Sequence, residues 1–155
     1  MTCKQTNKKN LMKELEFLID NNIKDKGEFQ LTNALENMKQ KGKIFSIGTV
    51  DEWLDCGNKD ATVYTSQRVL EHNKNTSMVN ENVDLINSEI IEPCYIANGI
   101  TIKNSKIGPH VSIDSGSIIE DSEISNSIIQ SKSTIKNAKL KNSMVGNHTF
   151  FDGHK

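Results

Sequence analysis

The chain has 155 residues, a formal net charge of −1 and an aromatic content of 5%. This length suits one domain or two small ones, and the near-neutral charge gives no electrostatic reason to bind nucleic acid or an anionic membrane. No apolar run approaches the roughly 18 residues of a membrane span. We therefore expect neither a nucleic-acid partner nor a membrane partner.

The three cysteines, Cys3, Cys56 and Cys94, are odd in number and widely separated. They show neither the spacing of a zinc site nor that of a disulfide framework, which predicts a protein of the reducing cytoplasm. The first ten residues are polar and basic. We expect them to form a solvated tail.

Two amphipathic helices are predicted near the start of the chain. Asn10 can cap a helix that runs to about residue 22, with its apolar residues on one face. A second helix, over about residues 30–41, has a similar face and ends at Gly42. The apolar residues of the two faces are Leu11, Leu15, Leu18, Ile19, Leu31, Ala34, Leu35 and Met38.

A short strand is predicted over residues 44–50, followed by a third helix over residues 59–71 that Asn58 can cap. The polar stretch 72–82 is expected to be a linker. Three helices and one strand cannot close a sheet. Their apolar faces therefore need a partner that these residues do not supply.

The last third of the chain repeats an aliphatic residue at steps of five or six. The ten positions are Ile96, Ile102, Ile107, Ile113, Ile119, Ile124, Ile129, Ile135, Leu140 and Val145. A small or β-branched residue stands two positions before each, and seven of the ten have Gly, Asn or Asp three positions before: Gly99, Asn104, Gly116, Asp121, Asn126, Asn137 and Asn142. This period fits neither a helix nor a flat strand, but it fits a hexapeptide β-helix.

In such a β-helix three repeats make one triangular coil, so residues about 16 to 18 apart stack. Residues 91–151 would supply between three and four coils. The expected ladders are Ile96, Ile113, Ile129 and Val145; Ile102, Ile119, Ile135 and Phe151; and Ile107, Ile124 and Leu140. Gly, Asn and Asp fit the positive φ of the corners.

Two motifs carry a resemblance to a known family. Gly-Glu-Phe-Gln-Leu-Thr-Asn-Ala-Leu over residues 27–35 precedes Val-Asp-Glu-Trp-Leu-Asp-Cys-Gly-Asn over residues 50–58. In motif and order the chain resembles the C-terminal part of bacterial sugar-1-phosphate nucleotidylyltransferases of the glucose-1-phosphate thymidylyltransferase type. The resemblance covers about residues 10–155, although many members have Thr where Asn58 stands.

The resemblance implies two domains. Residues 1–75 would be an α/β remnant, the C-terminal end of a Rossmann-like nucleotidyltransferase domain. Residues 76–155 would be a left-handed parallel β-helix of hexapeptide repeats.

The resemblance also implies a reaction. A nucleoside monophosphate passes from a nucleoside triphosphate, dTTP or UTP, to a sugar-1-phosphate such as glucose-1-phosphate, and pyrophosphate is released with the help of Mg²⁺. By this resemblance Asp55 would be the magnesium ligand, and Gly57 would let the backbone turn tightly beside it. Glu28 and Trp53 would lie near the sugar pocket.

The family's phosphate-binding loop has no counterpart, because the sequence contains no G-x-G. The family's second magnesium-binding aspartate is missing too. We therefore expect a fragment that is inactive alone and assign it no catalytic residue.

Two alternatives remain open. One is a hexapeptide acyltransferase in which His110 or His148, both predicted at turns, activates an acceptor. The other is a non-catalytic oligomerisation or regulatory module. In either case we expect a homo-oligomer, because the front helices and the last coil leave apolar surface uncovered.

Overall fold

The structure is a computed structural model that describes residues 5–154, with side chains from residue 8 onward. The expected tail residues 1–4, Cys3 among them, lie outside this range. The chain forms two compact units, one ending at Asp51 and the other beginning at Glu52. Within residues 5–154 no helix has the length and apolar character needed to cross a membrane.

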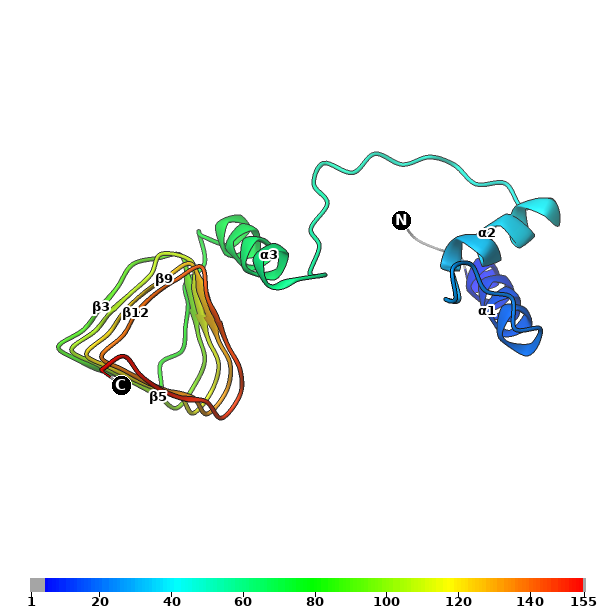
Figure 1. Cartoon of the computed structure of the whole chain (residues 1–155). Coiled ribbons are helices and arrows are strands. Elements are labelled where there is room, and N and C mark those ends of the chain that lie inside the picture. Colours follow the sequence, from blue (N-terminus) through cyan, green and yellow to red (C-terminus); the bar gives the residue numbers. More distant parts are fainter. Residues whose placement is uncertain (1–4, 155) are drawn as a thin grey trace. The chain divides into compact units, whose positions relative to one another are not determined.

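The first unit is a pair of helices, α1 (Gln5–Asp20) and α2 (Leu31–Gln40) (Figure 1). Its small core contains Leu18, Ala34 and Met38. Both predicted helices are confirmed, but α1 begins at Gln5, so Asn10 lies inside the helix and the prediction that it caps the helix is wrong. The expectation of a solvated tail is thus wrong from that residue onward, because residues 5–10 contain no glycine or proline to stop a helix.

The predicted strand over residues 44–50 is wrong. The segment has no secondary structure, and Ile44 and Ile47 are 97% and 102% exposed. A strand needs the backbone of a neighbour, and no segment of residues 5–154 pairs with this one. Its local sequence favours a strand, but the partner that would make it one is not in the part of the chain that is described.

The second unit is a parallel β-solenoid preceded by one helix, α3 (Lys59–His72). Seen along its axis, the solenoid is a triangle (Figure 1). Its three sheets have the strand orders β1-β4-β7-β10-β13, β14-β11-β8-β5-β2 and β12-β9-β6-β3. The strands are β1 (Met78–Val79), β2 (Val83–Ile86), β3 (Glu89–Ile90), β4 (Cys94–Ile96), β5 (Ile100–Lys103), β6 (Lys106–Ile107), β7 (Val111–Ile113), β8 (Ile118–Glu120), β9 (Glu123–Ser125), β10 (Ser127–Ile129), β11 (Thr134–Lys136), β12 (Lys139–Lys141), β13 (Met144–Val145) and β14 (Phe150–Asp152).

The predicted ladders are confirmed in register. Ile102 pairs with Ile119, Ile119 with Ile135, and Ile135 with Phe151. The other two ladders follow the predicted order as well. The inward isoleucines from Ile96 to Ile135 are almost wholly buried, so the core is a stack of aliphatic side chains between neighbouring coils.

The solenoid starts earlier than predicted. Residues 78–90 form a first coil in which Leu85 stacks on Ile102 and Ile90 on Ile107. The linker prediction for residues 72–82 is therefore wrong from Met78 onward. Polar residues dominate this stretch, but they stand at outward and corner positions.

The corners adopt the expected backbone. All seven predicted Gly, Asn and Asp residues have positive φ, and His110 and Lys132 share that conformation at equivalent positions. Buried serines tie successive coils together, since the Ser105 hydroxyl accepts the Ser122 N–H at 3.0 Å and the Ser122 hydroxyl accepts the Ala138 N–H at 3.1 Å. These inward serines thus satisfy backbone donors at the corners of the next coil.

Candidate metal-binding turn

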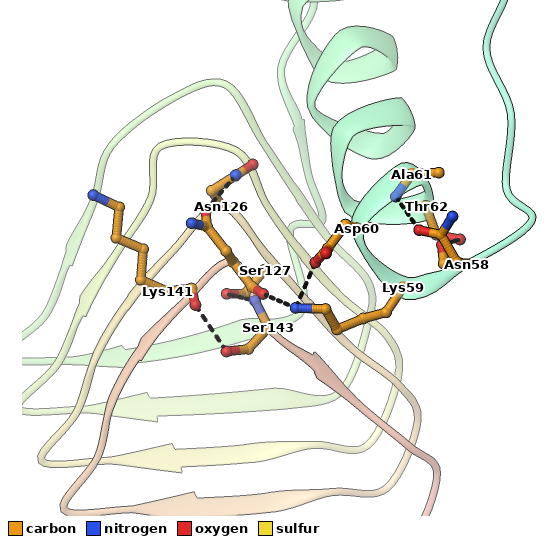
Figure 2. Close-up of polar contacts among 10 residues, drawn as sticks. Asn58, Lys59, Asp60, Ala61, Thr62, Asn126, Ser127, Lys141 and Ser143 are labelled. Atoms are coloured by element: carbon orange, nitrogen blue, oxygen red, sulfur yellow. Dashed lines mark hydrogen bonds and ion pairs between the residues drawn. The ribbon is translucent and has the colours of Figure 1, made fainter.

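The Trp-Leu-Asp-Cys-Gly turn, residues 53–57, leads directly into α3. Asn58 caps the helix as predicted, because its Oδ1 accepts the Ala61 N–H at 2.9 Å (Figure 2). A capped helix start fixes the direction in which the chain enters. The cap therefore fixes the C-terminal end of the turn.

Two threonines of α3 hold the backbone of the turn. The Thr65 hydroxyl donates to the carbonyl oxygen of Asp55 at 2.6 Å. The Thr62 hydroxyl donates to the carbonyl oxygen of Cys56 at 3.3 Å and to that of Asn58 at 2.8 Å. Residues three apart share a helix face, so one face of α3 lies along the turn.

Glu52 secures the other end of the turn. Its carboxylate accepts from the Nε of Arg68 at 2.6 Å and contacts the Nε2 of His72 at 2.8 Å. The hydrogen bond from Arg68, with help from His72, lowers the pKa of Glu52. The residues on both sides of Asp55 are thus bound to one helix.

Unlike the backbone carbonyl of Asp55, its side chain is not bound to α3. The carboxylate is exposed and, within residues 5–154, takes part in no hydrogen bond or ion pair. A Cβ on Gly57 would lie 3.0 Å from Asp55 Oδ2, so a glycine leaves this oxygen accessible. An exposed carboxylate on a fixed backbone fits one oxygen ligand of a hard cation.

Asp55 does not form a complete metal site by itself. In the described part of the chain no group of three or more His, Cys, Asp or Glu side chains could hold a metal ion. The remaining ligands of a magnesium ion would have to be water, substrate phosphate or residues outside this range.

The two predicted sugar-pocket residues belong to different units. Trp53 lies in the second unit and is 84% exposed. Glu28 lies in the first unit, where its carboxylate accepts from Gln30 Nε2 at 3.3 Å. Their roles at a sugar pocket stay predictions.

α3 also contacts the solenoid. Lys59 Nζ donates to the carbonyl oxygen of Asn142 at 3.1 Å (Figure 2). Farther along, the hydroxyls of Ser66 and Ser112 lie 3.2 Å apart. The helix therefore joins the turn on one side to the solenoid on the other.

His110 forms the third contact between α3 and the solenoid. Its Nε2 lies 2.5 Å from Glu71 Oε1, and its side chain is mostly buried. The hydrogen bond with His110 lowers the pKa of Glu71. His110 and His148 both have positive φ and stand at turns as predicted, and the contact with Glu71 gives His110 a structural role.

Sequence reasoning missed the α3 residues that bind the turn, Thr62, Thr65 and Arg68, and the one that binds the solenoid, Glu71. Their signal is the spacing of polar residues at three or four positions along the third helix. Such spacing usually indicates a solvated face. The structure shows that these side chains bind the turn and the solenoid instead.

An open groove of about 930 Å³ follows one corner of the solenoid. None of Glu28, Trp53 and Asp55 lines it. Four of its charged side chains form two ion pairs, Lys106 with Glu89 at 3.2 Å and Lys139 with Glu123 at 3.5 Å. A further carboxylate in the groove, that of Asp121, accepts from Asn104 Nδ2 at 3.0 Å.

The chain is similar to three curated proteins, and no family model matches it. It is 27% identical to a glucose-1-phosphate thymidylyltransferase of Streptomyces griseus, over 79% of this chain and 39% of that protein. It is 28% identical to a protein of the same name from Streptomyces antibioticus, over 78% of this chain and 38% of the relative. The bifunctional protein GlmU of Latilactobacillus sakei is 30% identical, over 72% of this chain and 27% of its own length.

The matched regions thus span well under half of each relative. They cover most of this chain, however, and the chain folds as helices followed by a parallel β-solenoid. This architecture is the one that the resemblance implies. The chain resembles the C-terminal part of a bacterial sugar-1-phosphate nucleotidylyltransferase of the glucose-1-phosphate thymidylyltransferase type, with a β-solenoid tail.

Proposed function

We propose that the chain supplies the C-terminal part of a nucleotidyltransferase that transfers a nucleoside monophosphate from a nucleoside triphosphate, dTTP or UTP, to a sugar-1-phosphate and releases pyrophosphate. The observation that carries the proposal is the similarity to two glucose-1-phosphate thymidylyltransferases over more than three quarters of this chain. The solenoid that follows α3 supports it.

In this proposal Asp55 contributes one magnesium ligand. Bound Mg²⁺ would offset the negative charge that develops on the phosphate oxygens during the transfer. The chain itself would present a carboxylate oxygen on a backbone that hydrogen bonds from α3 hold in place. Trp53 and Glu28 would contribute to the sugar pocket.

The 155-residue chain alone is proposed to be inactive, because its sequence contains no Gly-rich phosphate-binding loop. Purified chain with Mg²⁺, dTTP or UTP and glucose-1-phosphate should release no pyrophosphate above background. Release above background would show that these residues suffice for the reaction.

The positive test is a chimera in which this chain replaces the matched part of the Streptomyces griseus relative. We expect the chimera to release pyrophosphate and Asp55→Asn to reduce turnover severely. Asp51→Asn, which changes another exposed aspartate four residues away, is the matched control and should keep turnover. Equal turnover in both variants would remove Asp55 from the metal site.

We also propose that the chain forms a homo-oligomer, because apolar side chains are exposed in both units. Ile47 and Phe150, for example, are 102% and 63% exposed. Exposed apolar patches mark association surfaces. Sedimentation at micromolar concentration should show oligomers, and a stable monomer would contradict this part of the proposal.

A further inference from the structure

We infer that Thr65 and Arg68 are positioning residues for Asp55, and that the β-solenoid acts on the turn by holding the helix that carries them. This inference rests on the proposed role of Asp55 as a metal ligand. It assigns a task to α3: the helix is a brace between the solenoid and the turn.

The first argument is that the backbone of Asp55 is bound to α3 while its carboxylate is not. Its backbone carbonyl accepts the Thr65 hydroxyl at 2.6 Å, while its carboxylate faces solvent with no partner in residues 5–154. Thr65 thus fixes the residue without occupying the oxygens that a cation needs. A ligand held in place before binding loses less conformational entropy when the cation arrives.

The second argument is that the brace holds the turn on both sides of Asp55. Arg68 binds Glu52 ahead of it at 2.6 Å, and Thr62 binds the carbonyl oxygen of Cys56 after it at 3.3 Å. A turn held at one end can still swing about that end. Restraints on both sides leave the Asp55 backbone little freedom.

The third argument is that the brace is itself anchored. Glu71 and Ser66 bind His110 and Ser112 of one coil of the solenoid, and Lys59 binds Asn142 of another. The solenoid is a closed stack with a dry aliphatic core, so it offers a rigid platform. Rigid secondary structure beneath a binding loop is the usual way to hold ligands in their geometry.

Trp53 makes the inference measurable, because it is the only tryptophan of the chain and lies two residues before Asp55. Thr65→Val removes the hydroxyl but keeps the shape of the side chain, whereas Thr65→Ser keeps the hydroxyl. Thr76→Val is the matched control, since it makes the same change at an exposed threonine just after α3, whose hydroxyl takes part in no hydrogen bond within residues 5–154.

The first readout is time-resolved fluorescence anisotropy of Trp53 in the 155-residue chain. Thr65→Val should enlarge the fast, local component of the decay, while Thr65→Ser and Thr76→Val should match the wild type. Far-UV circular dichroism should be the same for all four proteins. An unchanged decay in Thr65→Val would overturn the positioning role.

The second readout uses Mn²⁺, which accepts the same oxygen ligands as Mg²⁺, as a paramagnetic probe of the single indole N–H signal. Losing one hydrogen bond from the brace should raise the Mn²⁺ concentration for half-broadening about fivefold in Thr65→Val. Thr65→Ser should restore it, and Asp55→Asn should abolish the effect.

The two readouts separate the inference from the proposed function. If Asp55→Asn leaves the broadening unchanged, the metal role of Asp55 fails, and the anisotropy still decides whether Thr65 holds the turn. If Asp55→Asn abolishes broadening but Thr65→Val behaves as wild type in both readouts, the metal role stands and the positioning role is overturned.

Discussion

The two units of the chain reach their hydrophobic cores in opposite ways. The solenoid buries aliphatic residues of its strands against the equivalent residues of the next coil, and nine isoleucines of residues 90–140 are almost wholly buried in it. The first unit buries only a few side chains between two helices, and apolar residues such as Leu31 and Ile44 remain 53% and 97% exposed.

The difference shows what a repeat provides. Every coil packs its inward side chains against the coil before it and the coil after it, so a short stretch of sequence completes its own core. A piece of a layered α/β domain has no such property, because a helix face or a strand needs a partner from elsewhere in the fold. The solenoid should therefore be stable by itself, whereas the first unit should depend on additional protein.

The largest expected effect is in the centre of the solenoid. Ile119→Asp places a charge in a dry core between Ile102 and Ile135, where it has no partner. The cost is several kcal/mol, enough to abolish the cooperative thermal transition of the solenoid. Circular dichroism against temperature measures it.

Ile118→Asp is the matched control, because Ile118 points outward beside Thr101 and Thr134 and is 40% exposed. Its melting temperature should stay within a few degrees of the wild type. If the two variants unfolded alike, the inward and outward assignment of β8 would be wrong.

A smaller effect is expected at a corner where two coils come close. A Cβ on Gly108 would lie 2.0 Å from the carbonyl oxygen of Ile91, and its φ of +109° is rare for other residues. Gly108→Ala should destabilise the solenoid by about 3 kcal/mol, because overlap adds to backbone strain. Denaturant unfolding gives the value.

Gly99→Ala separates the two contributions. Gly99 also has positive φ, but no atom lies within 4 Å of its added Cβ. We expect only the strain, about 1 kcal/mol. Equal losses in the two alanine variants would mean that close approach of the coils plays no part.

The solenoid could be predicted from sequence because its signal is local and repeated. The positions of Ile102, Ile119 and Ile135 follow from spacing alone, and so do the positive φ values of Asn104 and Asn137. The first coil obeys the same spacing through Val79, Leu85 and Ile90. It was missed because its polar residues gave the stretch the composition of a linker.

The predicted strand over residues 44–50 failed for the opposite reason. Its sequence favours extended backbone, but strand formation depends on pairing, which no local pattern contains. The candidate turn could be predicted only in part. Asp55 came from a resemblance, whereas its support by Thr65 and Arg68 depends on which face of α3 meets the turn, and only the structure shows that.

The smallest effect concerns the anchoring of α3 and its dependence on pH. The pKa of Glu71 is lowered, chiefly by His110, so the folded state binds a proton at this carboxylate less readily than the unfolded state. The contact therefore contributes stability above about pH 4.3, the ordinary pKa of glutamate, and loses it as pH falls through the lower folded-state pKa.

Glu71→Gln should remove this contribution. The melting temperatures of wild type and variant should differ most near neutral pH and converge in strong acid. A difference that stayed constant across the acid range would show that the charge of Glu71 does not hold the helix.

Amide hydrogen exchange at submicromolar concentration tests the contrast between the two units most directly. We predict strong protection at the paired strand positions of residues 83–152 and near-intrinsic exchange over residues 44–50, with α1 and α2 in between. Protection of residues 44–50 equal to that of the solenoid would contradict the account, because it would mean that the first unit already finds its strand partner within this chain.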